Sequence, residues 1–250
     1  MTQTETGTLK RRRLWSRFNR WLESKLLERV DPVRYNQLVR ATYDGPAGWF
    51  TLITGYLTGH EPLAKRLIGP RGFDIRGCKW ILDAGTGNGR YLRILLRRAD
   101  PDAVVVGCDL SLGMLRRARK RLKDCPVLLA QADVNRLPYP DECFDAIVFG
   151  WVLEHLPNPL QGLRELARVL RPEGKILLMT TEDNTLGAIT SRVYHCRATN
   201  RRQLREWCRQ AGLIWYRELW WSRLHRALKL GGILVELRRA PRQQGAKHES

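Results

Sequence analysis

Ile81-Leu-Asp-Ala-Gly-Thr-Gly-Asn-Gly-Arg-Tyr91 is the stretch of sequence that decides the fold. A short apolar run, typical of a buried strand, leads into glycines at 85, 87 and 89, and leucines with helical spacing follow. A strand that turns through glycines into a helix brings backbone N–H groups and a helix N-terminus to one point, which favours a negatively charged group. Glycine also lets a ligand approach the main chain closely. The stretch therefore predicts a ligand site at the end of a strand.

Strand and helix patterns alternate from about residue 79 to 182, which is typical of a parallel sheet. Five strands are expected at Lys79–Ala84, Ala103–Cys108, Val127–Gln131, Phe144–Gly150 and Lys175–Thr180. Helices are expected at Asn88–Arg98, Leu112–Leu122 (with Ser111 as N-cap) and Pro159–Leu170. A helix at Thr199–Ala211 and strand-like runs at Leu213–Leu219 and Gly232–Leu237 follow. The length of 250 residues is compatible with one large α/β domain or two small ones.

The second predicted strand ends in Asp109, 20 residues after Gly89, where a ribose-binding carboxylate is expected. A dinucleotide-binding turn has the pattern G-x-G-x-x-G, whereas this turn reads G-x-G-x-G and has Asp83 just before it. A carboxylate at Asp83 would repel a pyrophosphate but attract the ammonium group of an amino acid. S-adenosylmethionine carries such an ammonium group, so the turn favours this cofactor over a nicotinamide dinucleotide.

The set of motifs resembles that of class I S-adenosylmethionine-dependent methyltransferases. The segments that carry the resemblance are 81–91, Gly107-Cys-Asp-Leu-Ser111 with Met114, Gln131–Tyr139, Phe144–Leu156 and Leu163–Gly174. It is strong over residues 79–182 and loose over 199–238, and the subgroup resembled contains the ubiquinone/menaquinone-biosynthesis C-methyltransferases and other small-molecule methyltransferases. The resemblance implies an α/β fold: a doubly wound, seven-stranded, mostly parallel Rossmann-like sheet with a reversed last strand and a helical N-terminal cap.

The resemblance also implies which residues hold S-adenosylmethionine. They are Asp83, Gly85 and Gly87 around the methionine part, Asp109 at the ribose hydroxyls, and Leu110, Met114, Asp133 and Val134 around the adenine. Asp83 would bind the ammonium group directly or through water, and Asp109 would accept hydrogen bonds from both ribose hydroxyls. Core packing is an alternative explanation for Met114, and capping of a helix or turn is one for Asp133. No metal ligands are assigned.

Methyl transfer needs little acid–base chemistry, because the sulfonium of the cofactor is already a strong electrophile. A base is required only where the acceptor must lose a proton, as with a phenol or an enolisable ring. His155, just after the fourth predicted strand, is the candidate base, with Tyr194 and His195 as further candidates and a packing or orienting role as the alternative. Enzymes that methylate exocyclic amines usually carry an Asn/Asp-Pro-Pro-aromatic turn here. Phe149-Gly-Trp-Val-Leu-Glu154 differs from that turn, which disfavours a nucleic-acid substrate.

Both ends of the chain are strongly basic. The formal net charge is +19, and residues 1–40 and 192–250 carry most of the excess, whereas residues 41–191 are nearly balanced. The leader pattern predicts an amphipathic helix whose apolar face holds Leu14, Trp15, Phe18, Trp21, Leu22 and Leu26. Such ends suit an anionic partner, either a lipid surface or a nucleic acid, or they form only a solvated surface.

The acceptor is expected to bind to elements outside the common core, at residues 35–68 and 183–230, which are rich in aromatic side chains. Trp220-Trp-Ser-Arg-Leu-His-Arg-Ala-Leu-Lys229 mixes aromatics with cations, and we interpret Trp220 and Trp221 as a patch for a membrane interface. The same mixture can stack RNA bases. The sequence therefore favours a lipophilic, quinone- or lipid-like acceptor, with a soluble natural product and RNA as the alternatives.

We expect three segments: a basic amphipathic helical leader and cap at 1–70, a class I methyltransferase domain at 71–240, and a polar tail at 241–250. The six cysteines stand singly, which is typical of reduced thiols in the cytoplasm. No apolar run approaches the roughly 18 residues that a membrane-spanning helix requires. We expect a cytoplasmic enzyme, and the basic ends leave open a peripheral attachment to the inner face of a membrane.

Overall fold

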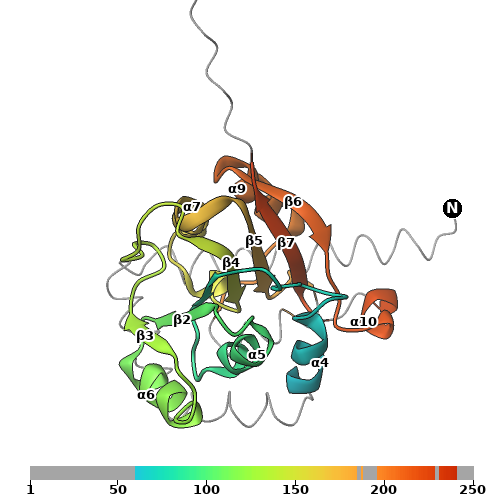
Figure 1. The fold of residues 1–250 in the computed structure, drawn as a ribbon. Helices are drawn as coiled ribbons and strands as arrows, with labels where there is room; N and C mark the ends of the chain where they lie inside the picture. Colours follow the sequence, from blue (N-terminus) through green and yellow to red (C-terminus); the bar gives the residue numbers. More distant parts are fainter. Residues whose placement is uncertain (1–59, 185–186, 188–195, 229–230, 241–250) are drawn as a thin grey trace, which may run out of the picture.

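The computed structural model describes residues 60–184, 187, 196–228 and 231–240. The leader helix predicted around residues 14–26 and the candidates Tyr194 and His195 lie outside the described residues. The described elements form one seven-stranded sheet with helices packed on both of its faces (Figure 1). The predicted boundaries between leader, domain and tail stay a prediction.

Seven strands lie in the order β3-β2-β1-β4-β5-β7-β6. Their bounds are Trp80–Ala84 (β1), Val104–Asp109 (β2), Leu128–Gln131 (β3), Phe144–Gly150 (β4), Leu170–Thr180 (β5), Leu213–Glu218 (β6) and Ile233–Arg239 (β7). The pairs among β1 to β5 are parallel, and β7 is antiparallel to both β5 and β6. This confirms the predicted mostly parallel sheet with a reversed last strand. The strand order reverses between β1 and β4, and the carboxyl ends of such strands border the crevice where ligands bind in open α/β sheets.

Helices cover both faces of the sheet. They are His60–Leu67 (α4), Arg90–Arg98 (α5), Leu112–Arg121 (α6), Pro159–Val169 (α7), Arg201–Gln210 (α9) and Arg223–Leu228 (α10), with a short 3-10 helix at Leu153–His155 (η1). Side chains of α4 and α5 join one apolar cluster, and those of α7 and α9 join the other. Successive residues of β7 alternate between the clusters, as the pleat of a strand requires. None of the described helices is both long and apolar enough to span a bilayer.

Capping side chains fix where several helices begin. Ser111 caps α6 as predicted, since its side chain accepts a hydrogen bond from the Met114 backbone N–H at 3.0 Å. Asn158 caps α7 in the same way. Helix α5 begins at Arg90 rather than at the predicted Asn88, because the intervening Gly89 has a left-handed φ of 79°.

The expected interfacial patch at Trp220 and Trp221 is wrong for Trp221. Its side chain is 2% exposed and belongs to the apolar cluster of α4 and α5. The indole Nε1 donates to the Gly231 carbonyl oxygen at 3.0 Å. Gly231 has a φ of 91°, and a Cβ there would overlap the indole ring. The local pattern of aromatics and cations predicts Trp221 at the surface. Its burial depends on Gly231, ten residues later, which leaves room for the indole ring.

Candidate functional site: a cofactor cavity at the carboxyl ends of β1, β2 and β4

The glycine-rich turn between β1 and α5 forms one wall of a cavity. Gly85 and Gly87 have φ values of 74° and 53°, which favour glycine. The backbone N–H groups of Gly85 and Thr86 both donate to the Cys108 carbonyl oxygen at 2.8 Å, which ties the turn to the end of β2. A Cβ on Gly85 would overlap the side chain of Val152, so close packing as well as φ requires glycine here.

Asp109 ends β2 beside this turn, and the backbone fixes its carboxylate. Oδ2 accepts a hydrogen bond from the Gly87 N–H at 2.8 Å, and Oδ1 accepts one from the Ser111 N–H at 2.9 Å. Because a carboxylate can accept several hydrogen bonds, two backbone donors can orient Asp109 while ligand hydroxyls bind it as well. This is the geometry expected of a ribose-binding carboxylate.

A cavity of about 210 Å³ lies between the turn, the end of β2 and the segment that follows β4. Eight of the nine predicted site residues line it: Gly85, Gly87, Asp109, Leu110, Met114, Asp133, Val134 and His155. They come from separate stretches of the sequence, and the parallel sheet brings these stretches together because the strands end at the same edge. Their individual roles in cofactor binding stay predictions.

Asp83 is the predicted residue that does not line the cavity. Its side chain is 1% exposed, and its Oδ2 accepts a hydrogen bond of 2.6 Å from the Thr86 hydroxyl, whose residue does line the cavity. Burial raises the pKa of Asp83 to about 7, and the nearby charge of Asp109 acts in the same direction. An ammonium group in the cavity would therefore be reached through Thr86 or through water, rather than by direct contact with Asp83.

An aromatic pair on the cavity wall was not predicted. Trp151 follows β4 with a left-handed φ of 62°, and its N–H donates to the Met179 carbonyl oxygen at 2.8 Å. Its indole Nε1 donates to the Tyr91 hydroxyl at 2.9 Å, and both side chains line the cavity. Burial raises the pKa of Tyr91 to about 12, so this hydroxyl is protonated at neutral pH. The indole also packs on Gly232, where a Cβ would lie 3.0 Å from Cη2.

His155 lies in η1 and lines the cavity. Burial lowers its pKa to about 4, so the imidazole is neutral at neutral pH and can accept a proton. The adjacent Glu154 is buried, and its two carboxylate oxygens accept hydrogen bonds from the hydroxyls of Thr180 and Thr181, both at 2.8 Å. Glu154 therefore holds the segment that carries His155 against the end of β5.

The chemistry of the cavity suits S-adenosylmethionine. Arg90 begins α5 and lines the cavity, so a cation and a helix N-terminus are available for the carboxylate of the methionine part. Asp109 can bind the ribose, and Leu110 and Met114 offer apolar surface to the adenine. In the described part of the chain, no group of three His, Cys, Asp or Glu side chains could hold a metal ion.

Comparisons with known proteins agree with this assignment. Residues 82–178 match the family model described as a methyltransferase domain. The ubiquinone/menaquinone biosynthesis C-methyltransferase UbiE of Desulfotalea psychrophila is 32% identical over 144 residues, which are 57% of this chain and 58% of that protein. The demethylmenaquinone methyltransferase of Lactobacillus johnsonii is 31% identical over 115 residues, which are 44% of this chain and 47% of that protein. The chain thus spans about half the length of the curated relatives that it matches.

A solved structure shares the fold as well. A chain from the complex between the Haloferax volcanii Trm112 methyltransferase activator and a methyltransferase superposes with a TM-score of 0.63 at 18% identity, and the match covers 85% of this chain and 100% of that chain. Residues 82–178 therefore form a methyltransferase domain, as the sequence predicted, and the solved structure shows that the surrounding residues share its fold. The cofactor that this family and its curated relatives imply is S-adenosylmethionine. The two curated relatives named above are a ubiquinone/menaquinone biosynthesis C-methyltransferase and a demethylmenaquinone methyltransferase.

Proposed function

We propose that this chain transfers the methyl group of S-adenosylmethionine to a small lipophilic acceptor of the quinone or lipid type. The main support for this proposal is that the part of the cavity wall outside the predicted cofactor residues is largely aromatic and apolar. Tyr91, Trp151, Val152 and Leu156 form this wall, together with a neutral His155. Aromatic and apolar side chains of this kind bind apolar molecules and exclude water from the transfer. The quinone-related names of the curated relatives support the same class of acceptor.

The main contribution of the protein's residues would be to position the cofactor and the acceptor relative to each other. When bound, S-adenosylmethionine supplies an electrophilic methyl group on a positively charged sulfur. Asp109 and the glycine turn would hold this cofactor. Trp151 is fixed at its backbone N–H, its indole N–H and its ring edge, and would hold the acceptor on the adjoining wall. Alignment of two reactants in this way can account for a large part of the rate of a transfer.

A ring-carbon acceptor would also lose one proton as its new carbon–methyl bond forms and the methyl–sulfur bond breaks. His155 is the group that we propose to accept this proton, because its imidazole is neutral at neutral pH. A pKa of about 4 makes His155 a weak base. It would therefore act on an acidic, phenol-like ring rather than on an unactivated carbon.

We further propose that the protein attaches to the cytoplasmic face of an anionic membrane, where lipophilic acceptors dissolve. The support is the formal net charge of +19 and its concentration at the two ends of the chain. Each Lys or Arg near an anionic surface contributes about 1 kcal/mol to attachment.

The experiment that tests the function uses radiolabelled S-adenosylmethionine and the full chain. Separate reactions receive chemically reduced demethylmenaquinone, a membrane lipid extract, an aqueous small-molecule extract or RNA, and Asp109→Ala serves as the variant with weakened cofactor binding. We expect label in the organic phase of the quinol or lipid reactions. Label in the aqueous small-molecule fraction would replace the proposal by a soluble acceptor, and label in RNA would make the protein an RNA methyltransferase. Absence of label from every fraction would overturn the enzymatic proposal.

A further inference from the structure

Helix α10 presents its apolar side chains to solvent. None of its residues is buried, and Leu224 and Leu228 are 65% and 57% exposed. These two leucines are four residues apart and so lie on one face of the helix. A surface helix of a globular domain normally turns its apolar face toward the core, so this orientation is the reverse of the usual one. Figure 1 shows α10 at the periphery of the molecule.

The segment at the N-terminal end of α10, which we call its base (Trp221 and Ser222), holds the helix, and its apolar face does not. Trp221, two residues before α10, is buried and anchors the connection. The Ser222 hydroxyl accepts a hydrogen bond from the His225 backbone N–H at 3.3 Å, and the Ser222 carbonyl oxygen accepts one from the Arg226 N–H at 3.1 Å. The base therefore fixes the helix in place while Leu224 and Leu228 remain available to a partner.

The charge around α10 indicates the chemistry of that partner. No acidic residue occurs between Leu219 and Val235, whereas Arg223, Arg226 and Lys229 lie in this stretch. Among the residues that the structure describes, no carboxylate forms an ion pair with Arg223 or Arg226. Two exposed leucines flanked by cations without acidic partners match the composition of a surface that lies in the headgroup region of an anionic bilayer.

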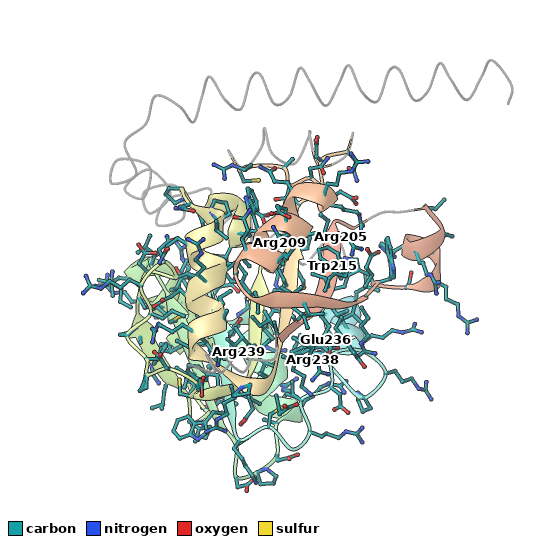
Figure 2. The ribbon with its side chains drawn as sticks, turned by 90° about the horizontal axis from the view of Figure 1, so that it is seen from above. Arg205, Arg209, Trp215, Glu236, Arg238 and Arg239 are labelled. Carbon is teal, nitrogen blue, oxygen red and sulfur yellow. The ribbon has the colours of Figure 1, made fainter. Side chains whose placement is uncertain are left out.

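Several other arginines of this region already pair with carboxylates. In α9, Arg205 lies over the Trp215 ring at 4.2 Å and pairs with Glu218 at 3.2 Å, and Arg209 pairs with Glu206 at 2.7 Å. Figure 2 shows Arg205 and Trp215 on the α9 side of the sheet edge and Glu236 and Arg238 on the other side.

On the side of the sheet edge away from α9, the buried Glu236 pairs with Arg217 at 2.8 Å and with Arg238 at 2.5 Å. Arg217 joins β6 to β7, and Arg205 joins α9 to β6. Because these arginines already have acidic partners, α10 is the better candidate for an external anion.

Two adjacent glycines connect α10 with the cavity wall. A Cβ on Gly231 would overlap Trp221 and lie 3.4 Å from Cδ2 of His225 in α10. A Cβ on Gly232 would lie 3.0 Å from Cη2 of Trp151, which lines the cavity. The two residues just before β7 therefore pack against Trp221 and His225 on one side and against the aromatic wall on the other.

We propose that α10 is the membrane-contact element of this protein. Leu224 and Leu228 enter the interface of an anionic lipid bilayer, Arg223 and Arg226 bind its headgroups, and the aromatic wall at Trp151 comes close to the surface that holds the acceptor. The part concerning the acceptor rests on the proposed function, whereas lipid binding by α10 does not.

Co-sedimentation of the full chain with vesicles tests the lipid contact. The vesicles consist of phosphatidylcholine mixed with phosphatidylserine, or of phosphatidylcholine alone. We expect Leu224→Gln with Leu228→Gln to lower partitioning onto the mixed vesicles by about tenfold or more, because two large apolar side chains no longer insert. Arg223→Gln with Arg226→Gln should lower it by roughly tenfold and remove much of the preference for phosphatidylserine.

Leu128→Gln is the matched control, because Leu128 is 59% exposed and lies on β3, at the opposite edge of the sheet. It should bind vesicles as the unmodified chain does, and circular dichroism should show all variants folded. Equal partitioning of the Leu224/Leu228 variant and the unmodified chain would overturn the proposal. An equal loss in Leu128→Gln would overturn it as well, since the effect would then not be specific to α10.

Methyl transfer distinguishes a failure of this inference from a failure of the proposed function. The Leu224/Leu228 variant should methylate a short-chain, water-soluble quinol as well as the unmodified chain does, but should methylate reduced demethylmenaquinone in vesicles several-fold more slowly. If the unmodified chain methylates neither quinol while the vesicle results are as expected, the acceptor proposal fails and the role of α10 stands. If the Leu224/Leu228 variant and the unmodified chain methylate the vesicle-bound quinol equally fast, α10 has no part in access to the acceptor.

Discussion

An Asp109→Asn variant would keep the shape of this side chain while it removes the charge and one of the two acceptor oxygens. In the structure, the carboxylate oxygens accept hydrogen bonds from the backbone N–H groups of Gly87 at 2.8 Å and Ser111 at 2.9 Å. An asparagine amide has a single acceptor oxygen, so one of these backbone donors would face an NH₂ group. The ribose hydroxyls of the cofactor would then compete with the other donor for the remaining oxygen.

Hydrogen bonds to a charged group contribute about 1.5–3 kcal/mol, so we expect the Kd for S-adenosylmethionine to rise roughly 10- to 150-fold. Isothermal titration calorimetry measures this change, and thermal unfolding checks that the variant folds. Asp102→Asn is the matched control, because Asp102 is an exposed carboxylate outside the cavity and should leave the Kd unchanged. The assignment of Asp109 to the cofactor is refuted if the two variants bind S-adenosylmethionine equally well.

Three further predictions concern the cavity. If His155 is the base, His155→Ala should lower kcat by roughly 10²–10⁴-fold with little change in cofactor affinity, and a loss below about threefold would assign it a packing role. Trp151→Phe removes the hydrogen bond to the Tyr91 hydroxyl and should cost about 1 kcal/mol in urea unfolding and raise the KM for the acceptor; unchanged stability and KM would contradict a positioning role. The folded pKa of Asp83 is about 7 against an ordinary value of 3.8, so the folded state keeps a proton that the unfolded chain releases between these values. The free energy of unfolding should therefore decline as pH rises from about 4 to 7, and Asp83→Asn should flatten that decline in urea titrations at several pH values; parallel profiles would show that Asp83 is not the group responsible.

The sequence predicted the sheet, and it predicted eight residues that line the cavity, because both depend on local patterns. Apolar runs, glycine spacing and the position of Asp109 at a strand end each constrain the backbone directly. The long-range contacts could not be predicted in this way. Nothing near Trp151 indicates that its indole reaches Tyr91, 60 residues earlier in the chain. The depth of Asp83 is a further example, because its spacing predicts a carboxylate near the site but does not indicate that the side chain is buried and bonded to the Thr86 hydroxyl behind the cavity wall.

The dipeptide Gly231-Gly232 shows how such long-range contacts join parts of the molecule that look independent in the sequence. Any side chain at Gly231 would displace Trp221, and with it the base of α10. A side chain at Gly232 would meet the Thr180 carbonyl oxygen and the ring of Trp151 on the cavity wall. Both residues also have left-handed φ values, 91° and 81°, so a substitution would strain the backbone as well. The two residues just before β7 therefore contact both the segment that carries the proposed membrane contact and the proposed acceptor wall.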